Sequence, residues 1–377
     1  MIPYGKQSVD EEDIQSVLDV LRSDWLTTGP KIEQFERAIA DYVGAQDAVA
    51  VNSGTAALHA AMFALGIGPS DEVIVPSMTF AATANCVVFQ GGTPVFADVE
   101  PETLLIDPAS VESRLSSKTK AIIAVDYAGH PCDYDALREI AQRNHLALVA
   151  DACHSLGGHY KDRPVGVLAA LNAFSFHPVK HITSGEGGMI TTNDQNLARR
   201  MRLFRNHGIS TDHRQREAQG SWFYEMLDLG YNYRITDFQC ALGISQLRKL
   251  PEWIRTRQKI ARRYNEAFHH SYRIKPLSVR AMAFHAYHLY VVRLDFDGTN
   301  LNRAMIFKEL RKAGIGVNVH YIPVHLHPFY QERFKTHPGL CPVSEQMYHE
   351  IISLPMYPML SNTEQDYVIT TLDKLMR

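Results

Sequence analysis

The feature that most constrains this chain is an alternation, over about residues 45–250, of short apolar segments with segments of helical periodicity. The apolar segments read DAVAV, DEVIVP, TPVFADV, TKAIIAVDY, LALVAD, AFSFH and GGMITTN. They are apolar along nearly their whole length, which indicates strands that are buried on both faces. Strands of this kind, alternating with helices, predict an α/β fold with a mostly parallel sheet flanked by helices.

The rest of the chain indicates a second unit. Helices are predicted at residues 10–23, 31–42, 134–144, 236–270, 302–313 and 363–376. In the C-terminal part, the segments HLYVVRLDF and GIGVNVHY alternate with helices, which is typical of a small α+β domain. We therefore expect a large α/β domain over residues 1–250 and a small C-terminal α+β domain over residues 251–377. Residues 1–13 are expected to pack on the small domain.

Charge and cysteine content argue against several classes of protein. A net charge of −3 over 377 residues gives no basic field for nucleic acid. The five cysteines form no CxxC pair and are odd in number, which favours reduced thiols in a cytoplasmic protein.

The acidic run at residues 10–13 argues against a signal peptide. Residues 73–97 carry no charge, but prolines, glycines and polar residues interrupt them, so we expect strand, helix and strand there and no membrane span.

Polar residues that follow the predicted strands are the candidate site, because parallel sheets bind ligands at the carboxyl ends of their strands. Ser53, Gly54 and Thr55 follow the first strand and open a helix, where free N–H groups suit a phosphate. The alternative is that Ser53 or Thr55 only caps this helix. The chain contains neither GxGxxG nor GxxxxGK[ST], which disfavours a dinucleotide or P-loop site.

Two further candidates are an acid and a lysine. Asp151 ends the segment LALVAD, and Lys180 follows the strand that carries Ser175. Simpler interpretations make Asp151 a cap or ion-pair residue and Lys180 a solvated lysine. His154 either touches the same ligand or caps a loop. Together, a phosphate cradle, an acid and a lysine before the glycine-rich SGEGG form the pattern of a pyridoxal 5'-phosphate site, in which the acid pairs with the pyridine nitrogen.

These residues sit in motifs through which the chain resembles, over essentially its whole length, the DegT/DnrJ/EryC1/StrS family of sugar aminotransferases. The matching motifs are NSGTAAL, PSMTFAATAN, DYAGHP, DACHSLGG, FSFHPVKHITSGEGG, RNHG and GYNYRITDFQCALGISQL. The resemblance implies the type I fold of pyridoxal phosphate-dependent aminotransferases, with a smaller C-terminal domain. It also implies a homodimer whose active sites are shared between the subunits.

The resemblance assigns roles to individual residues. Lys180 corresponds to the Schiff-base lysine, and Asp151 to the partner of the pyridine nitrogen. Phe80 falls where an aromatic ring stacks on the cofactor, and Asn232 where a residue reaches into the site of the partner subunit. His154 stands where many members carry glutamine, and it is taken as catalytic together with Lys180 and Asp151. The implied cofactor contacts are Ser53, Gly54, Thr55, Phe80, Asp151, His154, Ser175, Lys180 and Asn232.

A narrower set of motifs, IPYGKQ, DWLTTGP, VDYAGHP, VNVHYIPVH and ISLPMYP, resembles one branch of this family. That branch moves an amino group from L-glutamate to C4 of a UDP-linked 4-keto-6-deoxy-N-acetylhexosamine in pseudaminic acid biosynthesis. The implied substrate contacts are Tyr4, Asp24, Trp25, Leu26, Thr27, Gly54, Ser175, Asn232, His320, Tyr321, Ile322 and Pro323. A branch acting on UDP-4-keto-arabinose shares YAG and the histidine but differs around HYIPVHLHPFYQ. Enzymes acting on dTDP-keto sugars are a further alternative.

Three other interpretations have less support. Dehydratases of the same family replace the lysine with histidine, whereas Lys180 is present. Non-catalytic sensors that bind the cofactor usually carry a basic DNA-binding segment, and the sequence shows none. His320, His325 and His327 lack the spacing of a known zinc motif, so no metal is expected.

Two arginines have open roles. Arginine offers a bidentate fork to carboxylates and phosphates. Arg205 and Arg234 therefore either bind the glutamate carboxylate or UDP, or form structural ion pairs.

Overall fold

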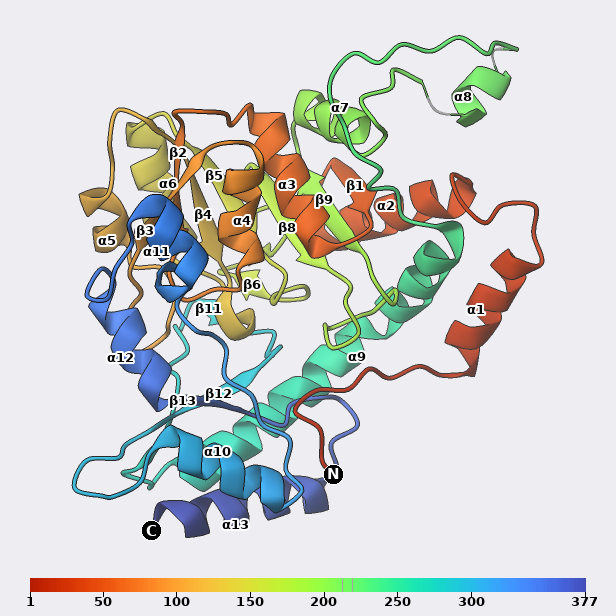
Figure 1. Cartoon of the computed structure of the whole chain (residues 1–377). Coiled ribbons are helices and arrows are strands. Elements are labelled where there is room, and N and C mark those ends of the chain that lie inside the picture. The colour runs from red at the N-terminus through yellow and green to blue at the C-terminus, as the bar shows by residue number, and fades with distance from the viewer. Residues whose placement is uncertain (212, 219) are drawn as a thin grey trace.

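The computed structural model describes residues 1–211, 213–218 and 220–377. At its centre lies a seven-stranded sheet with the order β1-β9-β8-β5-β4-β2-β3 (Figure 1). The strands are β1 (Asp47–Val51), β2 (Glu72–Pro76), β3 (Thr93–Ala97), β4 (Thr119–Val125), β5 (Ala147–Asp151), β8 (Leu171–Ser175) and β9 (Gly188–Thr192). Neighbouring strands from β3 to β8 are parallel, whereas β9 pairs antiparallel with β1 and β8. The predicted mostly parallel sheet is confirmed.

Helices cover both faces of this sheet. They are α2 (Pro30–Val43), α3 (Gly54–Leu65), α4 (Ala82–Phe89), α5 (Pro108–Ser113), α6 (Tyr134–Arg143) and α7 (Gln195–Phe204). Ile74 of β2 belongs to one apolar cluster with Phe35 of α2, and its neighbour Val73 to another with Leu58 of α3. Successive residues of one strand are therefore buried on opposite faces, which explains the continuous apolar runs in the sequence.

Local signals set the ends of the first helices. The side chain of Asp10 accepts a hydrogen bond from the N–H of Asp13 and caps α1 (Glu11–Leu21). Helix α2 begins with Pro30 and ends before Gly44, whose φ of 75° is left-handed and favours glycine. Both helices lie within two residues of their predicted ends.

A long helix connects the central sheet to a second apolar core. Helix α9 (Asp237–Phe268) runs without interruption through Pro251 (Figure 1). Its C-terminal half packs in a core with β10 (Ile274–Pro276), β12 (Tyr290–Leu294), β13 (Ile351–Leu354), α10 (Arg303–Lys312) and α13 (Asn362–Met376). The boundary predicted between residues 250 and 251 falls within α9, so the division into two domains stays a prediction.

Smaller elements complete the fold. These are β6 (His159–Tyr160), β7 (Arg163–Pro164), β11 (Ala283–Phe284), α8 (His213–Ala218), α11 (Pro328–Phe334), α12 (Pro342–Glu350) and the 3-10 turns at Tyr127–Gly129 and Val324–Leu326. The segment GIGVNVHY forms only isolated bridges, at Ile315 and Asn318. No helix in the described ranges is long and apolar enough to cross a membrane.

The first residues of the chain lie against its C-terminal part. Ile2 and Ile315 form a parallel bridge. The N–H of Met356 donates to the carbonyl oxygen of Tyr4 at 2.9 Å. The N-terminal segment is thereby held beside the second core, close to the carboxyl edge of the central sheet.

Candidate active site

A cavity of about 950 Å³ opens at the carboxyl edge of the sheet. Its walls come from the ends of β1, β5 and β8, the loop after β2, the N-terminal segment and residues 318–321. Eleven of the predicted site residues line this one cavity, namely Tyr4, Ser53, Gly54, Thr55, Phe80, Asp151, His154, Ser175, Lys180, His320 and Tyr321. Cofactor candidates and substrate candidates thus share a single space.

The start of α3 forms one wall. Ser53 caps this helix, because its hydroxyl accepts from the N–H of Ala56 at 3.1 Å. A Cβ atom at Gly54 would lie 2.9 Å from the Cβ of Ser175 and 3.2 Å from the Sγ of Cys153. Only glycine therefore allows the helix to start so close to β8. The first N–H groups of a helix lack intrahelical partners and carry partial positive charge, so this wall suits a phosphate.

Asp151 lies buried at the end of β5. Its Oδ2 atom accepts from the hydroxyl of Thr83 at 2.7 Å, and its Oδ1 atom accepts from the N–H of Cys153 at 3.3 Å. Both donors are neutral. Neither bond is therefore the structural ion pair that the sequence left open, and a cation that enters the cavity could pair with this carboxylate.

Lys180 is half-buried in the loop that follows β8. Burial lowers the pKa of its amine below the ordinary value, although nearby Cys153 and Asp151 oppose this shift. A lysine with a lowered pKa is more often neutral near neutrality and can serve as a proton acceptor. Its place on the cavity wall contradicts the interpretation as a solvated surface lysine.

Two rings and a histidine line the cavity beside Asp151. The Nε2 atom of His154 lies 3.2 Å from the hydroxyl oxygen of Tyr321. Within the described ranges, its Nδ1 atom has no hydrogen-bond partner. Burial and, to a smaller degree, the charge of Lys180 hold the pKa of His154 well below its ordinary value, so the imidazole is neutral. The rings of Tyr321 and Phe80 lie 5.9 Å apart, and Phe80 is 59% exposed.

Tyr4 and His320 bring the N-terminal segment and residues 318–321 to the same cavity. Their ring centroids are 5.6 Å apart. The Nδ1 atom of His320 lies 2.8 Å from the Oγ atom of Ser353, and its carbonyl oxygen accepts from the hydroxyl of Tyr127. These bonds fix the ring in place. Burial lowers the pKa of His320 to about 3, so this imidazole is neutral as well.

Seven predicted residues are not brought into the cavity of the single chain. They are Asp24, Trp25, Leu26, Thr27, Asn232, Ile322 and Pro323. Thr27 pairs with Thr236, and Asn232 with Asn206, in isolated bridges. The predicted contact of Asn232 is with a second subunit, which a single chain does not test.

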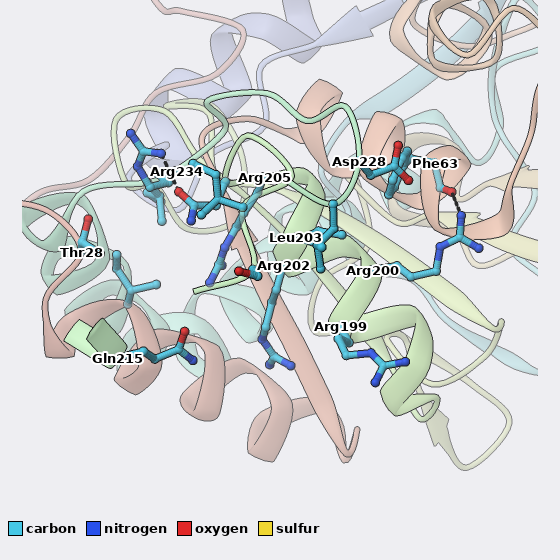
Figure 2. A pocket seen from close by; sticks show the side chains of 16 residues that line it. Thr28, Phe63, Arg199, Arg200, Arg202, Leu203, Arg205, Gln215, Asp228 and Arg234 are labelled. Atoms are coloured by element: carbon cyan, nitrogen blue, oxygen red, sulfur yellow. Dashed lines mark hydrogen bonds between the residues drawn. The ribbon is translucent and has the colours of Figure 1, made fainter. Parts of the chain in front are cut away.

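The two arginines with open roles line a second cavity, of about 720 Å³ (Figure 2). Arg205 forms an ion pair with Glu36 of α2 and donates to the carbonyl oxygen of Ala50 at 2.6 Å. Arg234 donates to the Oδ1 atom of Asn206 at 2.7 Å. In Figure 2 the guanidinium groups of Arg200 and Arg234 lie on opposite sides of the view and do not converge. The structural ion pair is found for Arg205.

Some residues of the first cavity were not predicted. Thr79, Cys153, Glu186 and Asn318 line it, and so does His288, whose ring centroid lies 4.4 Å from that of His154. The motif PSMTFAATAN contains Thr79 and could have drawn attention to it. His288 stands far along the chain in an apolar segment, and nothing in the sequence near it indicates a site.

Two histidines of the segment HYIPVHLHPFY, His320 and His325, bind separate partners. His325 lies between Ser77 and Glu345, with its Nδ1 atom 2.6 Å from the Oγ of Ser77 and its Nε2 atom 2.9 Å from the Oε1 of Glu345. His320 bonds Ser353 instead. In the part of the chain that the structure describes, no group of three or more histidine, cysteine, aspartate or glutamate side chains could hold a metal ion.

Comparison with known proteins gives consistent matches over the full chain. The sequence model of the DegT/DnrJ/EryC1/StrS aminotransferase family matches residues 7–373. The spore coat polysaccharide biosynthesis protein SpsC of Bacillus subtilis is 40% identical over 378 residues, which cover 100% of this chain and 97% of SpsC. Spr1654 of Streptococcus pneumoniae, solved in its PMP form, superposes with a TM-score of 0.94 at 33% identity, covering 100% of this chain and 99% of that one. PseC of Helicobacter pylori, an aminotransferase involved in the biosynthesis of pseudoaminic acid, superposes with a TM-score of 0.92 at 32% identity and the same coverage.

Proposed function

We propose that this chain, which belongs to the DegT/DnrJ/EryC1/StrS aminotransferase family, moves an amino group from L-glutamate to C4 of a UDP-linked 4-keto-6-deoxy-N-acetylhexosamine. The chain is a pyridoxal phosphate-dependent sugar aminotransferase of the type I fold. The donor, the sugar and the carbon atom are the proposal. The observation that carries it is that one cavity holds Asp151 and Lys180 together with the sugar candidates Tyr4, His320 and Tyr321. The similarity to PseC supports the choice of sugar.

The residues present fit the cofactor. The space left by the missing Cβ of Gly54, at the start of α3, suits its phosphate. Asp151 receives only neutral donors, so its charge is available for a protonated ring nitrogen. Phe80 offers an exposed aromatic face on the wall of the same cavity. The unpartnered Nδ1 atom of His154 is a further polar group for which a bound molecule could supply a partner.

When bound, pyridoxal phosphate supplies an aldehyde that condenses with amines and a ring that withdraws electrons from the reacting carbon. Lys180 would hold the cofactor through its Nζ atom until the amine of glutamate displaces it. Because burial lowers the pKa of this amine, Nζ can take a proton from the α-carbon of glutamate and later return one to C4 of the sugar. Glutamate leaves as 2-oxoglutarate, and the ketone becomes an amine. Both half-reactions use one site, which predicts ping-pong kinetics.

A homodimer with shared sites is part of the proposal. Large apolar side chains are exposed on the segment between α7 and α9, namely Trp222, Phe223, Tyr224, Met226, Leu227 and Leu229. In Figure 1 the part of this segment over residues 220–230 projects from the body of the molecule. An exposed apolar patch of this kind marks an interaction surface. Asn232 follows it and lies outside its own chain's cavity, which supports its predicted contact with a second copy.

We place the activity in the cytoplasm, because all five cysteines are free thiols. Four of them are buried. Thiols of this kind are typical of chains that stay in a reducing compartment.

The test is incubation of the purified, cofactor-loaded protein with L-glutamate and a panel of UDP- and dTDP-linked keto sugars. Product NMR would identify the aminated carbon and its configuration. We expect an amine at C4 of the UDP-linked 4-keto-6-deoxy-N-acetylhexosamine and release of 2-oxoglutarate. Amination of UDP-4-keto-arabinose alone, of a dTDP-keto sugar alone, or at C3 would contradict the proposed substrate.

A further inference from the structure

Two threonine hydroxyls lead from the cavity to the carboxylate of Asp151. Thr83 is the second residue of α4 and is fully buried. Its Oγ1 atom lies 2.7 Å from the Oδ2 atom of Asp151. The Oγ1 atom of Thr79, a residue of the cavity wall, lies 2.8 Å from that of Thr83. The three side chains form one continuous hydrogen-bonded series.

The chemistry of the groups fixes the direction of this series. An ionised carboxylate can only accept hydrogen bonds, so Thr83 must donate its single hydroxyl proton to Asp151. The oxygen of Thr83 is then left as an acceptor, and Thr79 must donate to it. Hydrogen bonds that run in one direction polarise one another and strengthen each other in a low dielectric. The hydroxyl proton of Thr79 therefore points towards the oxygen of Thr83.

The bond from Thr83 is shorter than the backbone bond that the carboxylate of Asp151 also accepts. The other comes from the N–H of Cys153 at 3.3 Å, two residues along the same segment. Thr83 belongs to a different element, 68 residues away in sequence. A bond from a separate, buried helix restrains rotation of the carboxylate about its Cβ–Cγ bond, which a weak bond from a neighbouring residue does poorly.

We propose that Thr83, supported by Thr79, is a positioning residue that orients the carboxylate of Asp151 towards the ring nitrogen of the cofactor. The inference rests on the proposed cofactor role of Asp151. Thr83 acts through Asp151, so its loss should matter only when the ligand carries a ring nitrogen for Asp151 to meet.

The experiment titrates the full-length protein, freed of cofactor, with two ligands. One is pyridoxal 5'-phosphate, and the other is its analogue with carbon in place of the ring nitrogen. Thr83→Val removes the hydroxyl at nearly constant shape, and Thr83→Ser keeps it. Thr191→Val is the matched control, because it removes a buried threonine hydroxyl that donates to the carbonyl oxygen of Gly166 at 2.7 Å, away from Asp151.

We expect Thr83→Val to weaken the binding of pyridoxal phosphate by roughly tenfold to a hundredfold, the usual cost of a hydrogen bond to a charged group. Its affinity for the analogue should stay within about twofold of that of the wild type, which would also show that the variant is folded. Thr83→Ser and Thr191→Val should bind both ligands like the wild type. Thr79→Val should weaken pyridoxal phosphate alone, by a smaller factor.

Other results would overturn the inference. If Thr83→Val loses affinity equally for both ligands, the threonine only shapes the pocket. If it binds pyridoxal phosphate as tightly as the wild type, the carboxylate does not need it. A wild-type chain that binds neither ligand would instead reject the proposed function, and this inference with it.

Discussion

His154 and Tyr321 are joined across the cavity, with the Nε2 atom of the histidine 3.2 Å from the hydroxyl oxygen of the tyrosine. One residue follows β5, and the other belongs to residues 318–321, so the bond connects the proposed cofactor contacts to the proposed sugar contacts. Burial keeps His154 neutral. Its Nδ1 atom lacks a partner among the described residues, so the orientation of the ring depends on Tyr321.

Tyr321→Phe should lower kcat/KM for the sugar roughly tenfold, because the ring of His154 loses the hydrogen bond that orients it. The melting temperature should change little. The control is Tyr367→Phe, which removes an exposed hydroxyl that donates to the carbonyl oxygen of Ala313 at 3.0 Å. Steady-state kinetics of both variants checks the prediction, and wild-type kinetics for Tyr321→Phe would show that the bond is dispensable.

Lys180→Ala should abolish the fixation of cofactor to protein by borohydride. It should also lower the rate of amino transfer by about a thousandfold or more, because the variant lacks the amine that moves the proton. Lys161→Ala is the control, since Lys161 is an exposed lysine paired with Asp135. Mass spectrometry of reduced, digested protein would locate the cofactor. Label on another lysine, or full turnover by Lys180→Ala, would refute the assignment.

Gly54→Ala should weaken cofactor binding, because the new Cβ would sit 2.9 Å from the Cβ of Ser175 and push the start of α3 from β8. We expect a loss of affinity of about tenfold or more, a change of roughly 1.4 kcal/mol. Gly68→Ala is the matched control, since a Cβ there meets nothing within 4 Å. Absorbance titration with pyridoxal phosphate measures both variants. Equal affinities would mean that the glycine does not shape the cradle.

Mixing two inactive variants should restore activity if the sites are shared. Lys180→Ala lacks the lysine of its own site, and Asn232→Ala lacks the residue predicted to enter the other subunit's site. After random exchange of subunits, half of the dimers are hybrids, and each hybrid has one intact site and one inactive site. Activity should therefore return to roughly a quarter of wild type. Enzyme assays after mild denaturation and refolding of the mixture test this. A mixture that stays inactive while hybrids form would contradict shared sites.

Acid should destabilise the protein through His59. Burial lowers the pKa of His59 to about 4 from an ordinary 6.5. Below pH 6.5, His59 therefore takes up a proton in the unfolded chain but stays neutral in the folded chain. The free energy of unfolding falls with pH until the pH reaches about 4. At about pH 5 the loss is on the order of 2 kcal/mol.

His59→Gln isolates this contribution. The variant should be less stable than wild type near neutral pH, since it loses the bond between Nδ1 and the hydroxyl of Tyr233 at 3.0 Å. Its further loss between about pH 7.5 and pH 5 should be smaller by on the order of 2 kcal/mol. Urea unfolding at the two pH values gives the difference. The same acid sensitivity in both proteins would rule out His59 as the cause.

Much of the central sheet could be predicted because burial on both faces leaves a direct mark on the sequence. Val73 and Ile74 are adjacent, and both are buried although they face opposite ways. The sequence does not indicate the direction in which β9 runs. An apolar strand reads alike in either direction, and β9 turns back antiparallel because the residues after β8 form the loop of Lys180 and not a crossover helix.

The residues of the candidate site also divide into those that the sequence predicts and those that it does not. Asp151 and Lys180 could be predicted because Asp151 ends β5 and Lys180 lies in the loop after β8, where topology alone brings side chains to one edge. Thr83 could not, because its bond to Asp151 depends on how α4 packs, and a threonine in the first turn of a helix is ordinary. His288 reaches the cavity through the packing of a distant segment. The place of Asn232 depends on a second copy, so the fold of one chain does not determine it.

The attachment of the N-terminal segment bears on how the protein should be purified. Tyr4 lines the cavity, its carbonyl oxygen accepts from the N–H of Met356, and the carbonyl oxygen of Ile2 accepts from the N–H of Gly316. An affinity tag fused ahead of Met1 would lie a few residues from Tyr4, a proposed substrate contact, and is expected to raise KM for the sugar. A tag after Arg377 would follow α13, which packs on the second core and contributes nothing to the cavity wall.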